Sequence, residues 1–495
     1  MLNNRQREIY QWLGQGSHFD YDPSNYSERI LQTPGYIDSD VEVNNIAVAA
    51  MTLWANAVAR IADTRGLGKQ GFTIDQRHAS LMLNSAVLHF QNGIQFSVGP
   101  VREKLNNFYA TQDDKHVFFQ GSYQTLREKL LAFLDCPNSE ARIQAATAGF
   151  NARDLDNQVA ELGLCAAILH TREEWLSTDI GRSIAQKPML DVSSMHHGAP
   201  VPLSKSVKRP LENIRVVDLT KVVAGPNISH QLAEQGADVI HCRHPYQDHT
   251  IPFQIEASYG KKNIFLDFSR SNDKALLQDL IRTADVVVDG LGAGGFSHAG
   301  FSKEALLALN PNLIYVQINC YDFDHAWEHR KGWEQLAQTV SGLAYLHSKG
   351  DVNNLKLIPA FFNDYLTGYL GACGVVEALL NRAEHGGAWN VRVSLVKTAM
   401  MAARFATGNG KHDPIGTHDL ETYLQDEDSG IGVLTRLRPP IDFDVTKSFS
   451  GRPASYPGTD PQDIGWGEDA LYSDLPRHRK SQLLDRNYIF NPISI

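Results

Sequence analysis

Between residues 214 and 319, short apolar runs alternate with amphipathic stretches, and this alternation constrains the fold more than any other feature. Helical patterns separate the runs, for example at 274–283 and 303–309. Strands joined by helices of this length pair in parallel. We therefore expect an α/β fold built on a doubly wound, Rossmann-like parallel sheet. The expected strands are 214–219, 238–242, 263–268, 285–289 and 313–319.

Asp364 is the candidate catalytic residue. It is the only acid between Asp351 and Glu377, and it follows two phenylalanines where a helix should begin. A carboxylate in such apolar surroundings is partly desolvated, which makes it a better nucleophile or base. Asp is also a preferred helix N-cap, so simple capping is the alternative interpretation.

The helix after Asp364 carries a stripe of glycines. Gly368, Gly371 and Gly374 recur at every third position, while the apolar residues keep helical spacing. Because glycine has no side chain, we expect another element to pack very close to this stripe.

The chain contains a partial internal repeat. A helix at 47–63, a glycine-bearing turn and a strand at 72–75 match the helix and strand that follow Asp364. In an ungapped match Ala47 falls opposite Asp364. The first copy is therefore expected to lack the carboxylate.

The remaining patterns divide the chain into consecutive parts. A hairpin near 108–120 and the helical stretches after it predict a small α+β domain, and the last segment is rich in Gly and Pro with poor periodicity. The predicted parts are 1–100, a partial first copy of large-domain helices and strand; 101–195, the small α+β domain; 196–210, a linker; 211–407, the Rossmann-like catalytic domain; and 408–495, a C-terminal arm.

Charge and cysteine usage narrow the functional classes. A net charge of −10 without basic runs disfavours nucleic acid or an anionic membrane as partner. The five cysteines include no CxxC pair, so neither a metal site nor a disulfide framework is predicted. The N-terminus lacks a signal-peptide core, and polar residues interrupt the apolar stretch 46–62. We expect a buried helix there and a cytoplasmic protein.

The run 289–296 (DGLGAGGF) contains G-x-G-x-x-G directly after an expected strand. A dinucleotide site also requires a helix starting at the glycines and an acid about 20 residues further on. Both are missing, so NAD or FAD is not favoured. The loop can still bring a ligand's phosphates or acyl group close to the backbone.

Taken together, these motifs resemble the class III CoA-transferases, the family that includes formyl-CoA transferase, carnitine CoA-transferases and α-methylacyl-CoA racemase. Residues before the linker, including 173–182 (EEWLSTDIGR), resemble the later part of the same fold. The chain thus resembles a truncated first copy joined to a second, or a permuted single fold. The matching segments, in family order, are 210–226, 236–240, 260–267, 284–288, 310–315, 332–342 and the D-x-x-x-G at 364–368.

The resemblance implies an acyl-CoA:carboxylate CoA-transferase in which Asp364 attacks the thioester and forms a covalent aspartyl intermediate. It implies coenzyme A as a substrate, no tightly bound cofactor, acyl-CoA and carboxylic acids as partners, and an interlaced homodimer. Lys261 and Lys262, beside Arg243, are candidates for pairing with phosphates. The implied CoA-binding positions are Val223, Ala224, Arg243, His244, Leu266, Asp267, Gly290, Leu291, Gly292, His298, Lys331, Gly332 and Trp333.

Several positions depart from the family pattern. The loop GLGAGG replaces one that usually carries a polar residue and a proline, and His298 stands where many members have Arg. Trp333 occupies the position of a catalytic His in the racemase branch. The alternatives are an acyl-CoA racemase or isomerase that uses Asp364 as a base, and a non-catalytic CoA-ester binding protein.

Overall fold

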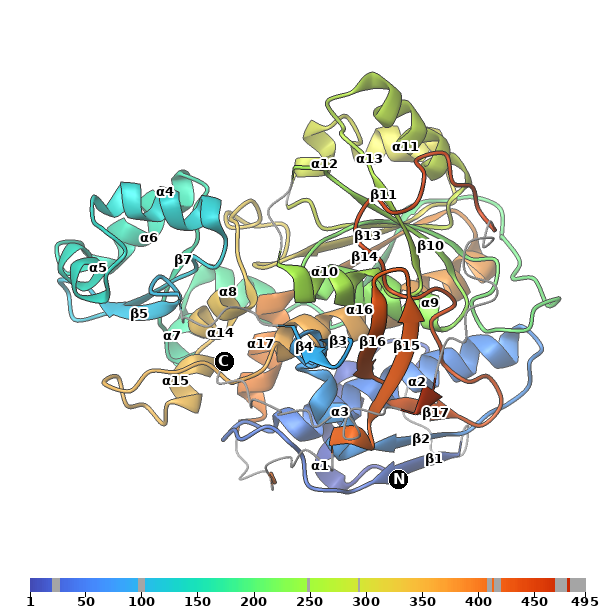
Figure 1. Ribbon diagram of the computed structural model, residues 1–495, viewed down its shortest axis with the longest axis horizontal. Coiled ribbons are helices and arrows are strands. Elements are labelled where there is room, and N and C mark those ends of the chain that lie inside the picture. Colours follow the sequence, from blue (N-terminus) through green and yellow to red (C-terminus); the bar gives the residue numbers. More distant parts are fainter. Residues whose placement is uncertain are drawn as a thin grey trace.

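A seven-stranded sheet forms the centre of the molecule (Figure 1). The computed structural model describes residues 1–19, 27–96, 103–246, 250–292, 294–406, 412–413, 420–467 and 479–480. The strand order of this sheet is β11-β10-β9-β12-β13-β14-β8. Its members are β8 (Asp191–His196), β9 (Arg215–Leu219), β10 (Asp238–Arg243), β11 (Lys261–Phe265), β12 (Val286–Asp289), β13 (Ile314–Asn319) and β14 (Ala388–Ser394).

Neighbouring strands from β11 to β14 are parallel, and β8 runs antiparallel along β14. In chain order the parallel strands follow the 3-2-1-4-5-6 arrangement of a doubly wound Rossmann-like sheet. The predicted α/β fold class is confirmed. The strand bounds differ by one residue at β9, β10, β12 and β13 and by two to three residues at β11, which ends at Phe265. Leu266 and Asp267 therefore lie just beyond its carboxyl end.

Helices cover both faces of the large sheet, because successive strand residues point to opposite sides. Val216 and Val286 pack with α9 and α16 on one face, while Val217 and Val287 pack with α11 and α13 on the other. The helices of this part are α9 (Ala224–Glu234), α10 (Ile251–Ser258), α11 (Ser271–Thr283), α12 (Gly295–His298), α13 (Lys303–Leu309), α14 (Glu334–Val340), α15 (Leu343–His347), α16 (Phe362–His385) and α17 (Leu395–Arg404).

The small domain lies at the left of Figure 1 and has its own hydrophobic core. Its antiparallel strands are followed by helices, as the sequence predicts, but strand β8 pairs with β14 of the large sheet. Residues 191–195 therefore belong to the large sheet, and His196 ends a strand and is not part of a linker. The elements of this region are β5 (Asn107–Ala110), β6 (His116–Phe119), α4 (Gln124–Leu134), α5 (Glu140–Thr147), α6 (Ala152–Glu161), β7 (Ala166–Ile168), α7 (Arg172–Ser177) and α8 (Asp179–Ala185).

Strands near the two ends of the chain pair with each other, in sheets ordered β1-β2-β17 and β18-β15-β16-β3-β4. Residues 424–443 of the predicted C-terminal arm contain three strands, of which β16 pairs with β3 and β17 pairs with β2. The elements are α1 (Asn4–Leu13), β1 (Glu28–Leu31), α2 (Val43–Thr64), β2 (Phe72–Asp75), α3 (Gln76–Met82), the 3₁₀ turn η1 (Ser85–Val87), β3 (Phe90–Gln91), β4 (Ile94–Gln95), β15 (Leu424–Ser429), β16 (Gly432–Leu437), β17 (Ile441–Phe443) and β18 (Arg479–Lys480).

The order α2-β2-α3 repeats the order α16-β14-α17, and α2 packs against α16. Ala47 lies in α2 and is fully buried. By length and composition α2 could also cross a membrane, but 83% of its most apolar window is buried inside the protein. In the structure it serves as a core helix.

The glycine stripe of α16 lies against α9 and β14. A Cβ atom added to Gly371 would lie 2.6 Å from Cδ1 of Ile228, and one added to Gly374 would lie 2.4 Å from Cγ1 of Val391. The predicted close approach is confirmed.

We expect Gly368→Ala to destabilise the protein by about 1–2 kcal/mol, even though alanine favours helices. Its Cβ would lie 2.5 Å from Nδ2 of Asn227, and that amide donates a hydrogen bond to the carbonyl oxygen of Tyr365. Urea denaturation measures the change. Gly451→Ala, where the added Cβ meets nothing within 4 Å, is the control. Equal stability of the two variants would contradict the close packing.

Candidate active site

Asp364 is the third residue of α16, and Phe361 occupies the N-cap without a side-chain capping bond. The Asp364 side chain is 8% exposed, and its carboxyl makes no hydrogen bond or ion pair with any residue that the structure describes. Burial raises its pKa from 3.8 to about 7. Simple capping is therefore excluded as its role, and the carboxyl is left free for chemistry.

Glu334, the first residue of α14, is a second buried acid at this site. It accepts hydrogen bonds from Nε2 of Gln338 at 2.7 Å and from Nδ2 of Asn363 at 3.2 Å. Burial raises the pKa of Glu334 well above its usual range, and the negative charge of Asp364 raises it further. Ionisation of Asp364 therefore disfavours ionisation of Glu334. Sequence analysis placed this stretch in the matching segment 332–342 but assigned Glu334 no role.

The turn between β9 and α9 brings Val223 and Ala224 to the start of α9. The preceding residue, Val222, has φ 71°, in the left-handed region that β-branched residues avoid. Such strain is concentrated at functional sites. No pattern in the sequence signals it.

Residues after β10 and β11 meet as predicted. The backbone N–H of Leu266 donates to the carbonyl oxygen of Arg243 at 2.9 Å, and Nε2 of His244 lies 3.5 Å from Oδ1 of Asp267. Burial lowers the pKa of Arg243, whereas the negative charge of Asp218 opposes that shift. His244 is exposed, while Arg243 is buried.

The glycine loop after β12 lies beside the turn after β9. A Cβ on Gly290 would lie 3.0 Å from Cγ2 of Thr220. Leu291 is 39% exposed, and Gly292 has φ 86°. His298, exposed at the end of α12, has Nδ1 2.6 Å from the carbonyl oxygen of Gly294.

The segment Lys331, Gly332 and Trp333 connects these loops to Asp364. A Cβ on Gly332 would lie 2.4 Å from Sγ of Cys320, whose thiol pKa is raised by burial and by nearby charges that include Asp364. The structure therefore brings together the predicted residues that follow the carboxyl ends of the strands. Asp364 lies close to the same end of the sheet.

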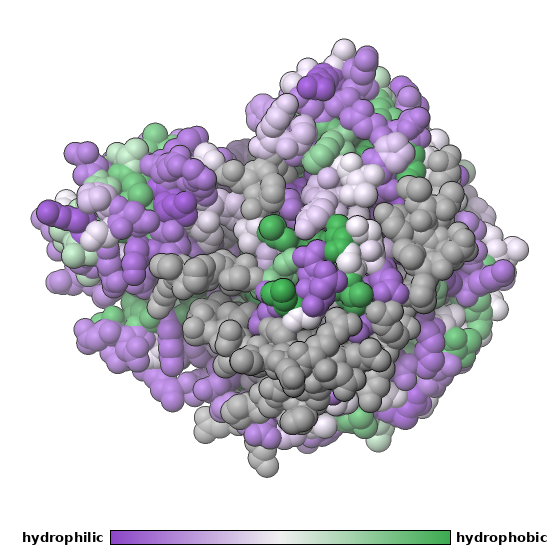
Figure 2. Space-filling model, viewed as in Figure 1, coloured by the Kyte–Doolittle hydropathy of each residue, from purple (hydrophilic) through white to green (hydrophobic). Residues whose placement is uncertain are grey.

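The small domain covers this segment. The Tyr123 ring stacks on Trp333 with centroids 4.9 Å apart, and Nε2 of Gln120 donates to Oε1 of Gln335 at 2.8 Å. Figure 2 shows a notch between the small domain on the left and the upper part of the large domain. Sequence analysis missed Tyr123, because no local pattern links a residue after a hairpin to a loop more than two hundred residues away.

Lys261 and Lys262 were predicted to be available for phosphates, but both ammonium groups are already paired with carboxylates of this chain. Nζ of Lys261 is fully buried, 2.9 Å from Oδ2 of Asp218. Nζ of Lys262 lies 2.8 Å from Oδ1 of Asp238. These lysines stabilise the sheet beneath the loops.

Residues of the N-terminal half form hydrogen bonds with the residues on both sides of Asp364. The backbone N–H of Phe361 donates to the carbonyl oxygen of Leu83 at 3.1 Å. The Tyr365 hydroxyl accepts a hydrogen bond from the backbone N–H of Ala86 at 2.8 Å and donates one to Oε1 of Glu256 at 2.9 Å. The partial copy that lacks the carboxylate therefore positions the helix that carries it.

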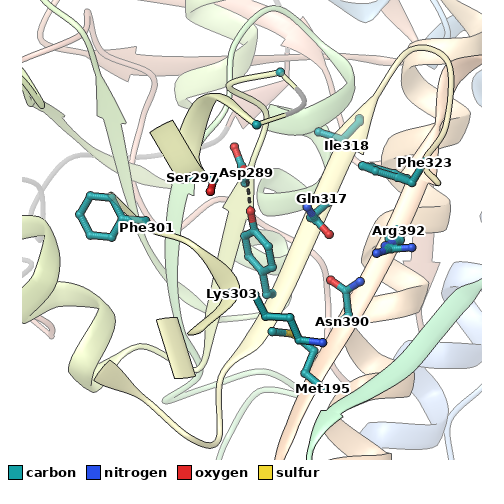
Figure 3. A pocket seen from close by; sticks show the side chains of 13 residues that line it. Met195, Asp289, Ser297, Phe301, Lys303, Gln317, Ile318, Phe323, Asn390 and Arg392 are labelled. Carbon is teal, nitrogen blue, oxygen red and sulfur yellow. Dashed lines mark hydrogen bonds between the residues drawn. The ribbon is translucent and has the colours of Figure 1, made fainter. Parts of the chain in front are cut away.

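A separate cavity of about 210 Å³ lies along β12, β13 and β14 (Figure 3). Inside it the Tyr315 hydroxyl donates to Oδ2 of Asp289 at 2.6 Å, and Asn390 and Arg392 lie along β14. Gly292 is the one predicted CoA-binding residue that lines this cavity, and Asp364 does not line it. In the described part of the chain, no group of three or more His, Cys, Asp or Glu side chains could hold a metal ion.

Comparison with known proteins finds that part of the chain matches the family that the sequence motifs resemble. Residues 211–424 match CoA-transferase family III. The chain is 32% identical over 324 residues to the acetyl-coenzyme A transferase nodX of Hypoxylon pulicicidum, a match covering 59% of this chain and 53% of that protein. It is 31% identical over 215 residues to a succinate–glutarate CoA-transferase of Agrobacterium fabrum, a match covering 39% of this chain and 54% of that protein.

The chain spans about half the length of the curated relatives it matches. Among solved structures, it is similar to the hypothetical protein Rv3272 of Mycobacterium tuberculosis, with 28% identity over 39% of this chain and 55% of that chain, and a TM-score of 0.36. A CAIB/BAIF family protein of Brucella suis has 24% identity over 46% of this chain and 65% of that chain, with a TM-score of 0.37.

Proposed function

We propose that the chain is an acyl-CoA:carboxylate CoA-transferase, because residues 211–424 match CoA-transferase family III. The observation that carries the proposal is the buried Asp364 carboxyl, which has no partner among the described residues and a pKa raised to about 7. A poorly solvated carboxylate without hydrogen bonds is a strong nucleophile. The relatives named as acetyl-CoA, acyl-CoA and succinate–glutarate transferases support this class of reaction.

The proposed reaction has two symmetrical halves. An oxygen of Asp364 attacks the thioester carbonyl carbon, the C–S bond breaks, and CoA thiolate leaves behind a mixed anhydride. The thiolate then attacks the aspartyl carbonyl, which releases the donor carboxylate and leaves an aspartyl-CoA thioester. An acceptor carboxylate reverses both steps and departs as the new acyl-CoA, so Asp364 is regenerated.

We place coenzyme A across the carboxyl ends of β9 to β13, where open α/β sheets bind ligands. Arg243 and Lys331 supply positive charge there, and the strained turn at Val222 presents the start of α9. Trp333, held by Tyr123, forms the wall between the CoA groove and Asp364. The Glu334 carboxyl, whose pKa is raised by burial, is the donor we assign to the oxyanion that develops beside Asp364.

The proposal also includes a homodimer and a cytoplasmic location. The cysteines that the structure describes are all free thiols, which suits a reducing compartment.

Trapping the activated carboxyl tests the proposal. We expect a panel of acyl-CoA esters followed by hydroxylamine to leave a hydroxamate on Asp364, detected by intact-protein mass spectrometry and peptide mapping. Asp364→Ala is the matched control. Binding of CoA esters without any adduct or exchange of CoA between acids would contradict the transferase proposal.

A pKa near 7 also suits a base that removes an α-proton, so racemase or isomerase chemistry is the second candidate. The two are separated by incubating a chiral 2-methylacyl-CoA in D₂O without any acceptor acid. A transferase leaves the α-proton in place, whereas a racemase exchanges it for deuterium.

A further inference from the structure

We propose that a cavity between α1, α7, α8 and α17 binds a small organic carboxylate at a site separate from Asp364. The cavity has a volume of about 90 Å³ and is lined by residues from four helices and from the end of α14. Neither Asp364 nor Glu334 is among the lining residues. The inference does not depend on the proposed transferase activity.

The cavity has an excess of positive charge. Arg172 and Arg404 line it, and neither guanidinium forms an ion pair or hydrogen bond with a described residue. Lys187 and Lys397 also line it, but the buried Asp322 carboxylate lies 3.1 and 3.9 Å from their Nζ atoms. Among the described residues, no carboxylate lines the cavity. In a protein with a net charge of −10, two uncompensated arginines at one cavity indicate an anionic ligand.

The wall of the cavity contains an unused donor. Trp175 is 1% exposed, and its indole Nε1–H is buried without an acceptor among the described residues. Buried donors are nearly always paired, because an unpaired one is destabilising. Nε1 itself is closed off from solvent, so an oxygen of a bound anion would become its acceptor only if the Trp175 ring shifts toward the cavity.

Size and wall chemistry define the class of anion. One water needs about 10–15 Å³ by this measure of volume, so the cavity accommodates about six to nine non-hydrogen atoms. Leu176, Ile184 and Met400 provide apolar walls, and the planar arginine groups match a carboxylate. A short-chain monocarboxylate of the size of butyrate meets all these conditions.

The experiment is a titration of tryptophan fluorescence with sodium butyrate at constant ionic strength, because Trp12 and Trp175 both line the cavity. The protein is the full chain carrying Asp364→Asn, so that events at the nucleophile do not contribute. Butan-1-ol tests whether the charge is needed, and inorganic phosphate tests whether any small anion is sufficient. The test variant is Arg172→Gln/Arg404→Gln. Its matched control, Arg60→Gln/Arg153→Gln, removes two exposed arginines elsewhere.

We expect saturable binding of butyrate, none of butanol, and a loss of affinity of about tenfold or more in the test variant. The control variant should stay within about twofold, and circular dichroism should show that both variants are folded. The proposal is overturned if butyrate does not saturate, if both arginine pairs weaken it equally, or if phosphate binds more tightly than butyrate.

Discussion

Asp364→Asn is expected to reduce CoA transfer by at least about a thousandfold, because the amide cannot attack a thioester. The fold should remain intact, since the carboxyl makes no hydrogen bond that the substitution would remove. Exchange of radiolabelled CoA between two acids measures the rate. In the wild type the rate should rise with pH as Asp364 ionises near pH 7. If the variant kept more than a tenth of the activity, the nucleophile would have to be another residue.

The same substitution should stabilise the protein at alkaline pH. The folded-state pKa of about 7 is higher than the ordinary 3.8, so the folded protein holds this proton more tightly than the unfolded chain does. The resulting stability is complete below about pH 3.8 and is lost as pH rises through 7. The loss has an upper limit of about 4 kcal/mol. Asparagine does not ionise, so the variant does not lose this stability at high pH.

Calorimetry of the wild type and Asp364→Asn at pH 5 and pH 8 measures this difference. We expect the advantage of the variant to be large at pH 8 and to shrink towards pH 5. The contributions of the other titrating groups cancel in this stability difference, because the two proteins differ at one residue. An advantage that does not change with pH would mean that Asp364 is well solvated.

Lys261→Met is the second substitution with a large expected effect, a loss of about 3–5 kcal/mol in the free energy of unfolding. The side chains of Lys261 and Asp218 are both fully buried, and the ammonium also donates to the carbonyl oxygen of Pro226. Methionine would leave the Asp218 carboxylate buried without its cation. The hydroxyls of Thr220 and Ser229 still bond to it, but they carry no charge.

The neighbouring lysine gives a matched control for this experiment. Nζ of Lys262 pairs with Asp238, whose side chain is 22% exposed, so water can solvate the carboxylate when the lysine is removed. Lys262→Met should therefore cost markedly less. The double variant Asp218→Asn/Lys261→Met should recover part of the loss, because no buried charge remains. Urea denaturation that gave equal losses for both lysines would show that Asp218 does not need its cation.

The fold of 211–407 was predictable because its determinants are local. Each strand is an apolar run, each helix has its own periodicity, and parallel pairing follows from the helical connections. Asp364 was found in the same way, as an isolated acid in an apolar segment. The structure then excluded N-capping, which the sequence had left open, because Phe361 occupies the N-cap.

What sequence analysis missed depends on contacts between distant segments. Tyr123 reaches Trp333 only because the small domain folds over the large one. Strands β16 and β17 pair with strands near the N-terminus, and their own periodicity gave no sign of it. Lys261 stood where a phosphate ligand was plausible, and the buried Asp218 that neutralises it is forty-three positions earlier. Such partners are fixed by the tertiary structure alone.

The burial of Ala47 shows how the two similar helices differ in electrostatic cost. Its side chain is enclosed in the core where α2 packs against α16, so an aspartate there would be buried with its charge against apolar neighbours. Asp364 is also buried, and desolvation raises its pKa to about 7. The fold therefore carries the cost of a desolvated carboxyl in α16, while the matched position in α2 is packed around an alanine methyl group.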